Sequence, residues 1–410
     1  MRSKVKSPAV ARSGGSALVP TRRFPEFVGH PLQEVRLADA TAESTERNGA
    51  GQATSQIMGV SKVEGIVPME ERIVAADTAR YKFVRKDWFA YNPMRLNIGS
   101  IARWQGDSEI LVSPDYVVFK CKGAGPHRLD PAYLDHFRRS DAWEEFVSEK
   151  GDGSVRVRIY YKDLVRLQLA LPSFPEQQKI ADCLDSVDAL IAAQGRKVEA
   201  LKAHKKGLMQ QLFPQDGDTQ PRRRFPEFDG AREWEEAKLQ AACTMQAGKF
   251  VAASEINEHA AEELFPCYGG NGLRGYTASF THSGKYPLIG RQGALCGNVK
   301  LAVGKFHATE HAIVARPKRG VSVDWLFYLL DHLDLNQFAT GQAQPGLSVD
   351  VLNNVMTSIP LDEVEQQRIA YCFTSLDNLI AAESKKLDTL KTHKKGLMQQ
   401  LFPQVGETDA

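Results

Sequence analysis

The side chains best suited to chemistry lie in two glycine-containing stretches, Trp88–Trp104 and Tyr268–Lys300. Arginine and lysine suit guanine edges and phosphates, whereas asparagine and glutamine suit adenine edges. An ordinary polar loop is an equally good interpretation of any single member, so the hypothesis depends on the group. We predict that DNA is bound by Tyr91, Asn92, Arg95, Asn97, Arg103, Tyr268, Asn271, Arg274, Arg291, Gln292, Asn298 and Lys300.

Known catalytic motifs are missing from the sequence. It has no G-x-x-x-x-G-K-[ST], no G-x-S-x-G and no H-E-x-x-H. Gly269–Gly272 is rich in glycine but lacks a strand-then-helix frame, so a loop that lets the backbone approach a ligand is the better interpretation. His307 and His311 lead into an expected strand, where they would not share a face. Asn92-Pro93-Met94 lacks the second proline and the aromatic residue of adenine methyltransferases. We therefore predict no catalytic residue, no metal and no cofactor in this chain.

The sequence repeats itself at half its length. His204–Gln215 occurs again without a change at His393–Gln404, and Arg22–Phe27 matches Arg223–Phe228. A period this long indicates a duplicated domain pair rather than a solenoid. The chain is therefore two halves of one design.

A heptad pattern precedes the end of each half. Its apolar positions are Ile180, Leu184, Val187, Ile191, Val198, Leu201, Leu208 and Leu212, and then Ile369, Phe373, Leu376, Ile380, Leu387, Leu390, Leu397 and Leu401. Each helix should span about 35–40 residues, or roughly 55–60 Å, and end at Phe-Pro. The two could pair with each other or each with another protein. Pseudosymmetry between the halves favours an antiparallel coiled coil.

Between the helices, each half looks α/β or mostly β. The expected strands are Ile110–Val112, Tyr116–Lys120, Tyr286–Ile289, Asn298–Val303 and Ala312–Ala315. The expected helices are Tyr133–Glu149 and Asp324–Phe338, each followed by a turn, with Gly151 and Gly153 or Gly341 and Gly346. The predicted fold class is α+β, with two globular domains alternating with two long helices in a pseudo-two-fold repeat.

Composition and charge limit the kinds of ligand and cellular setting that suit this chain. A formal charge of +2 excludes polyanion binding by bulk charge, although residues 1–23 carry six basic side chains and no acid. We interpret residues 1–21 as a disordered basic arm. No apolar run approaches the roughly 20 residues of a membrane helix. The six cysteines form no C-x-x-C pair, which argues against zinc and suits the reducing cytoplasm.

These features together resemble the specificity subunit of type I restriction–modification enzymes, from Phe24 to Gln404. The resemblance rests on the alternation of globular part and helix, and on Glu-Gln-Gln-(Lys/Arg)-Ile at both helix starts. It also rests on the globular motifs Asn92–Arg95, Ser113–Tyr116, Tyr268–Gly272, Ile289–Gly293 and Gln344–Ser348. The first half departs from the family pattern at Pro31–Glu34, where the second half has Glu233–Glu236. We therefore do not predict whether the first globular part begins with a strand.

The resemblance implies a non-catalytic subunit whose globular parts each bind one half of a bipartite asymmetric DNA target. It implies that the helices bearing the seam residues set the gap and dock two methyltransferase subunits, which use S-adenosylmethionine. Two motor-nuclease subunits would use ATP and Mg²⁺. The domains expected are 1–21 arm, 22–172 and 223–360 recognition domains, 173–215 and 361–404 spacer helices, 216–222 linker and 405–410 tail. The competing hypotheses are an enzyme with an unusual site and a coiled-coil scaffold without DNA specificity.

Overall fold

The computed structural model describes residues 20–49, 56–69, 78–149, 158–215, 217–293, 295–341 and 345–402. Residues 1–19 of the predicted arm, the tail at 405–410, and Gly151, Gly153 and Gln344 lie outside these ranges. The chain divides into two compact units. Unit 1 comprises Met1–Ala193 and Leu387–Ala410, and unit 2 comprises Gln194–Lys386. Each unit thus combines one globular part with a segment of each long helix.

The described residues of unit 1 form two four-stranded sheets and one two-stranded sheet. The first has the order β2 (Thr41–Ser44), β9 (Val117–Cys121), β6 (Trp88–Tyr91), β7 (Ile101–Arg103). The second has the order β4 (Gly65–Pro68), β3 (Ile57–Ser61), β8 (Ile110–Val112), β5 (Lys82–Val84). The two-stranded sheet pairs β1 (Gln33–Arg36) with β10 (Gln168–Leu171). The opening strand that the sequence left open is therefore present.

The helices of unit 1 are short apart from the long one. They are α1 (Leu37–Ala40), α2 (Pro131–Phe137), α3 (Asp141–Glu149) and α4 (Tyr161–Leu164). The predicted single helix Tyr133–Glu149 is wrong, because a turn after Phe137 divides it. The Ser140 hydroxyl accepts a hydrogen bond from the Trp143 amide at 3.4 Å and so starts a second helix.

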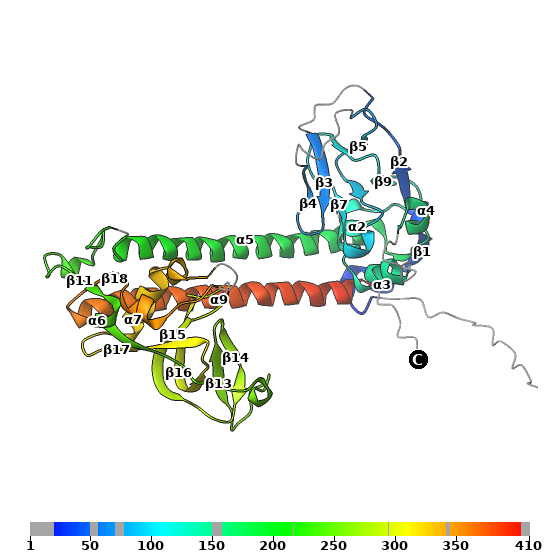
Figure 1. The fold of residues 1–410 in the computed structure, drawn as a ribbon. Coiled ribbons are helices and arrows are strands. Elements are labelled where there is room, and N and C mark those ends of the chain that lie inside the picture. The colour runs from blue at the N-terminus through cyan, green and yellow to red at the C-terminus, as the bar shows by residue number, and fades with distance from the viewer. Residues whose placement is uncertain are drawn as a thin grey trace, which may run out of the picture. The chain divides into compact units, whose positions relative to one another are not determined.

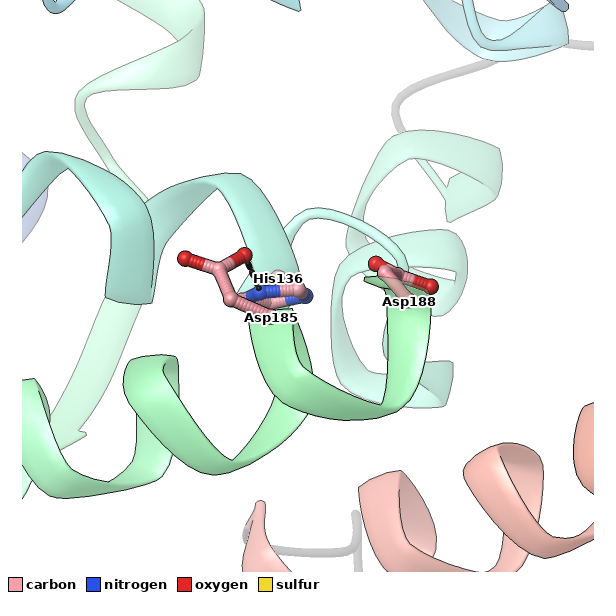
Figure 2. A group of neighbouring side chains, drawn as sticks. All are labelled: His136, Asp185 and Asp188. Atoms are coloured by element: carbon pink, nitrogen blue, oxygen red, sulfur yellow. Dashed lines mark hydrogen bonds and ion pairs between the residues drawn. The ribbon is translucent and has the colours of Figure 1, made fainter. Parts of the chain in front are cut away.

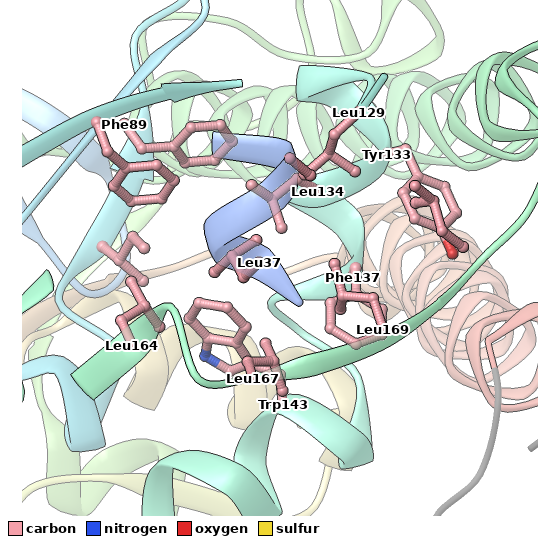
Figure 3. Packing of buried hydrophobic residues seen from close by; sticks show 14 of the residues in the cluster. Leu37, Phe89, Leu129, Tyr133, Leu134, Phe137, Trp143, Leu164, Leu167 and Leu169 are labelled. Carbon is pink, nitrogen blue, oxygen red and sulfur yellow. The ribbon is translucent and has the colours of Figure 1, made fainter. Parts of the chain in front are cut away.

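The core of unit 1 packs α1 and α2 against aromatic residues of the first sheet (Figure 3). Phe89 and Phe119 stack with ring centroids 5.0 Å apart, and Leu37 is fully buried among them. Trp143 of α3 and Leu164 of α4 close the cluster. Burial of these large side chains supplies most of the driving force for folding this unit.

Unit 2 contains one six-stranded sheet, a two-stranded sheet and three short helices. The sheet order is β12 (Cys243–Ala247), β17 (Ala312–Pro317), β15 (His282–Gly290), β16 (Val299–Ala308), β13 (Phe265–Gly269), β14 (Gly272–Thr277). β11 (Glu235–Lys238) pairs with β18 (Met356–Ile359), and the helices are α6 (Leu239–Ala242), α7 (Val323–His332) and α8 (Val349–Asn353). The expected helix Asp324–Phe338 is too long: α7 ends at His332, and Asp334 at φ +43° turns the chain into a 3-10 helix, Leu335–Phe338.

The long helices are α5 (Phe174–Leu212) and α9 (Glu363–Leu401), drawn green and red in Figure 1. Within unit 1, Asp188 of α5 accepts from Lys394 of α9 at 2.6 Å. Within unit 2, the Gln194 side chain donates a hydrogen bond to Glu383 at 2.6 Å, and Lys205 donates to Asp377 at 2.7 Å. Partner numbers fall along α9 as they rise along α5, so the helices run antiparallel, as predicted.

The repeat extends to individual contacts. In unit 1 the Gln177 side chain accepts from the Asp130 amide at the start of α2, and in unit 2 Gln366 accepts from the Ser322 amide at the start of α7. Tyr133 of α2 lies 5.3 Å from the Phe402 ring, and Trp325 of α7 lies 6.3 Å from the Phe213 ring. Helices α2 and α7 are therefore equivalent elements.

In each half, the Arg-Arg-Phe-Pro-Glu-Phe motif contacts the Glu-Gln-Gln-(Lys/Arg)-Ile motif at the start of the long helix. Arg23 donates to Glu176 at 2.8 and 2.5 Å, and Arg224 donates to Glu365 at 2.8 and 2.6 Å. Glu176 and Glu365 are buried, so each arginine satisfies a carboxylate that water does not reach. The Arg-Arg-Phe-Pro-Glu-Phe segment thus clamps the first turn of its own helix.

Candidate nucleic-acid interface

Glycines bring four loops of unit 2 together. A Cβ atom on Gly290 would lie 2.0 Å from the Gly270 carbonyl oxygen, and one on Gly248 would lie 2.2 Å from that of Ala308. Only glycine permits such close approach of two backbones. The turn between β13 and β14 therefore rests directly on the end of β15.

Hydrogen bonds then join the end of β15 and the residues that follow it to neighbouring loops. The Arg291 amide donates to His311 at 2.9 Å, and the Gly293 amide donates to Pro345 at 3.0 Å. The Asn298 side chain donates to Asn271 at 3.3 Å. An open cavity of about 600 Å³ lies beside these contacts and is lined by residues 269–274, 292, 293 and 311.

Of the seven side chains predicted to bind DNA in unit 2, Asn271, Arg274 and Gln292 line this cavity, and Asn298 is hydrogen-bonded to Asn271. The exposed ones are Asn271, Arg274, Gln292, Asn298 and Lys300, and Arg291 is half-buried. Tyr268 differs, because its ring packs edge-on against Phe306 at 5.8 Å and burial raises its pKa. The structure thus collects residues that are separated along the sequence into one polar, basic surface.

Unit 1 does not collect its predicted residues in the same way. Tyr91 is fully buried, burial raises its pKa, and its ring packs edge-on against Phe119 at 6.3 Å. The predicted contact between Tyr91 and DNA is therefore wrong for this structure. Asn92 caps a turn by accepting from the Met94 amide at 2.9 Å.

The remaining predicted residues of unit 1 are separated. Arg95 and Asn97 are exposed on the turn before β7. Arg103 lines a different cavity, together with Arg138 and Arg139, which the sequence argument missed. The signal in the sequence was the adjacent Arg138-Arg139 pair alone, because its position after a helix appears only in the structure.

The two histidines considered in the sequence do not form a metal site. His307 is buried, and its Nε2 lies 3.1 Å from the Lys249 carbonyl oxygen. His311 lies 3.3 Å from Glu310. Each side chain therefore has its own polar neighbour.

Within the described ranges, one group of three side chains has metal-ligand spacing, namely His136, Asp185 and Asp188 (Figure 2). His136 Nε2 lies 2.8 Å from Asp185, and burial lowers the pKa of His136. Lys394 donates to both oxygens of Asp188 at 2.6 Å. Lys394 already neutralises the Asp188 carboxylate that a metal would need. The group therefore consists of a hydrogen bond that joins α2 to α5 and an ion pair that joins α5 to α9.

None of the helices in the described ranges combines the length and apolar character needed to cross a bilayer. The six cysteines are free thiols.

Comparison with known proteins shows similarity to type I restriction specificity subunits. Residues 231–392 match the family model "Type I restriction modification DNA specificity domain". The chain is similar to the type I restriction enzyme EcoprrI specificity subunit of Escherichia coli, with 44% identity over 36% of this chain and 34% of that protein. It is also similar to the MjaVIII specificity subunit of Methanocaldococcus jannaschii, with 27% identity over 67% of this chain and 70% of that protein. The first of these matches spans about a third of its relative.

Solved structures agree on the fold. The S subunit of a type I restriction–modification system from M. genitalium superposes with a TM-score of 0.62 at 14% identity, covering 94% of this chain and all of that one. A chain from a study of assembly and conformational transition of the type I system gives 0.56 at 17% identity, over 91% and 98%. Residues 231–392 are thus similar to the DNA specificity domain of type I restriction–modification systems, and the chain shares the fold of solved S subunits.

Proposed function

We propose that this chain is the DNA-recognition subunit of a type I restriction–modification complex, each globular part binding one half of a bipartite, asymmetric DNA sequence. The observation that carries the proposal is a division between constant and variable residues. The anchors Arg23–Glu176 and Arg224–Glu365 are the same, whereas the loops around Asn97 and Asn271 differ. Different loops on one framework suit two unlike half-sites.

Partner docking is supported by the exposed residues of the exact repeat. His204 and Lys206 are exposed, and so are their copies His393 and Lys395. Packing within the chain does not require exposed residues to be identical. A surface kept twice suits two copies of one partner, which we propose are methyltransferase subunits that use S-adenosylmethionine.

The seam residues assigned to the docking helices are buried or partly buried. Ile180 and Leu184 lie in the hydrophobic core of unit 1, and Ile369 and Phe373 lie in that of unit 2. Docking by these helices therefore uses outward-facing residues, with the seam holding the helices in shape. Two motor-nuclease subunits with ATP and Mg²⁺ would complete the complex, in the cytoplasm of a bacterium or archaeon. The chain itself would carry no catalytic residue or cofactor.

We propose that the helices set the gap between the half-sites. Each has 39 residues, which corresponds to about 58 Å at about 1.5 Å per residue. One heptad added to both helices lengthens each by roughly 10 Å, or about three base pairs at about 3.4 Å per pair. The tolerated gap should grow by that amount while both half-sites stay the same.

The experiment that tests the function is a map of modified bases in host DNA with and without this gene. We expect methyladenine on both strands of a split motif of constant gap, lost on deletion. The heptad variant should shift the gap alone. An unaltered methylation pattern on deletion would contradict the proposal and favour a protein-binding scaffold.

A further inference from the structure

A second cavity, in unit 1, has the composition of an anion site. It has a volume of about 490 Å³ and lies between the turn joining β3 to β4, strand β7 and the end of α2. Its charged core consists of Arg103, Asp135, Arg138 and Arg139, here named the arginine pocket. Lys62 and Glu64 lie at the rim, exposed to solvent.

The arginine pocket holds three guanidinium groups around one buried carboxylate. Asp135 accepts from Arg138 at 2.7 Å and from Arg139 at 3.4 Å. The side chains of Arg138 and Asp135 are only 11% and 8% exposed. Burial lowers the pKa of Arg138, and the neighbouring Arg139 and Arg103 lower it further. The cationic groups therefore repel one another. Asp135 is the one buried carboxylate among the residues that line the pocket, and outside the lining Arg139 Nη1 lies 3.8 Å from the partly exposed Asp188.

Arg103 adds an unsatisfied donor to the pocket. Its side chain is 11% exposed, and Nη1 contacts the partly exposed Asp87 at 3.3 Å. Its Nε is buried, and no acceptor for it lies among the described residues. Buried donors without a partner are rare in folded proteins and indicate that an acceptor is supplied from elsewhere.

We propose that the arginine pocket binds a phosphate group. A guanidinium group presents parallel N–H donors that match two phosphate oxygens at once, and three such groups can share the oxygens of one phosphate. The charge on the phosphate would offset the repulsion among the arginines, and its oxygens would accept from Arg103 Nε. A neutral ligand could accept from Arg103 Nε but would not offset the repulsion.

The source that we favour is the backbone of DNA beside the half-site bound by unit 1, which rests on the proposed function. A neighbouring cavity shares Lys62, Arg138 and Arg139 with the arginine pocket and is also lined by Asn97, one of the residues predicted to contact DNA. Phosphate contacts fix the position of a protein on DNA without selecting sequence. The alternative source is a free phosphate or phosphate ester.

Unit 2 supplies an internal comparison. Because α2 and α7 are equivalent, Leu330 and Asp331 of unit 2 occupy the positions of Arg138 and Arg139. An apolar and an acidic side chain cannot hold a phosphate. The pocket therefore belongs to unit 1 alone, and the two halves should hold their DNA segments differently.

The first arm of the test measures binding of the full chain to duplex DNA over a range of salt concentrations. The variants are Arg139→Gln and Arg103→Gln, with Arg166→Gln as the matched control because Arg166 is an exposed arginine of unit 1 outside the cavity. Each lost phosphate contact should reduce the slope of log K against log salt by about 0.9 and weaken binding to all sequences equally. The control should keep the wild-type slope.

The second arm uses inorganic phosphate and no DNA, and so does not depend on the proposed function. The thermal midpoint of wild type should rise in phosphate over chloride at equal ionic strength, because a ligand of the folded state stabilises it. Arg139→Gln and Arg103→Gln should lose that rise. A phosphate response together with a changed DNA slope identifies the DNA backbone as the source, and a phosphate response alone identifies a free phosphate.

The inference is overturned if wild type gains nothing from phosphate and both variants keep the wild-type DNA slope. Failure of the proposed function would appear differently, as wild-type binding that shows no preference for any sequence. Each variant must first show a wild-type midpoint in chloride. Arg139, at 42% exposed, is the safer replacement in this respect.

Discussion

Replacing Arg224 by methionine tests whether the motif clamp holds unit 2 together. Arg224 and Glu365 form a two-pronged ion pair at 2.8 and 2.6 Å, with side chains 15% and 2% exposed. Removing one partner of a buried pair leaves the other charge without compensation, at a cost of about 3–5 kcal/mol. We expect a loss near 3 kcal/mol, because Trp234 Nε1 still donates to Glu365 at 3.2 Å.

The assay is unfolding in urea and by heat. For a unit of this size, about 3 kcal/mol corresponds to a fall in Tm of about 6–12 °C. The matched control is Glu227→Gln, which removes the exposed ion pair with Arg368, three residues after Glu365 on α9. Exposed pairs contribute little, so the control should leave Tm unchanged.

The double variant Arg224→Met, Glu365→Met separates the two causes. If the cost comes from a charge left unpaired in the interior, replacing both partners restores part of the lost stability. Equal losses from Arg224→Met and Glu227→Gln would refute the reasoning. They would mean that the motif is conserved between the halves for a purpose other than clamping the helix.

The remaining predictions concern His136 of α2 and the glycines of the two long helices. Burial lowers the pKa of His136, so the unfolded chain binds a proton at this histidine more readily than the folded chain does. The free energy of unfolding should therefore be greatest above the ordinary histidine pKa of about 6.5 and should fall as the pH drops below it. His136→Tyr, which copies Tyr328 of unit 2, should remove that dependence in unfolding measured from pH 5 to 8. Gly207 lies in α5 and Gly396 in α9, and a Cβ atom at either position would meet open space. Because alanine favours a helix over glycine, Gly207→Ala and Gly396→Ala should each stabilise the free chain by about 0.5–1 kcal/mol. Gly195→Ala, outside the repeat, should stabilise equally, and a loss of methylation confined to the repeat variants would place the partner over these glycines.

Much of the framework could be predicted from the sequence because it depends on periodicity. The heptad seam of α5 and α9 and the strands around Leu288 and Leu111 follow from patterns of apolar residues alone. Pairing direction followed from the repeat. The break after Phe137 was not predicted, because the apolar pattern continues through it and only the Ser140 cap marks the start of a second helix.

The candidate site was harder to predict because exposure is a tertiary property. Tyr91 and Tyr268 stand among polar loop residues in the sequence, yet their rings pack against Phe119 and Phe306. Arg138 and Arg139 lie far from Arg103 in the sequence and meet it only when α2 packs beside β7. Composition identifies the kinds of residue that bind DNA, and the fold decides which of them reach the surface.

The clamp explains how one framework can carry two unlike globular parts. Each globular part is fixed at its entry by Arg23 or Arg224, and at its equivalent helix by Gln177 or Gln366. Gln366 also donates to the Pro360 and Gly320 carbonyl oxygens at 2.9 and 3.1 Å, so one side chain ties the end of the globular part to α9. None of these contacts involves the loops around Asn271 or Asn97. The loops can therefore change without loss of anchoring energy, and a change of DNA target need not disturb the helices on which the partners would assemble.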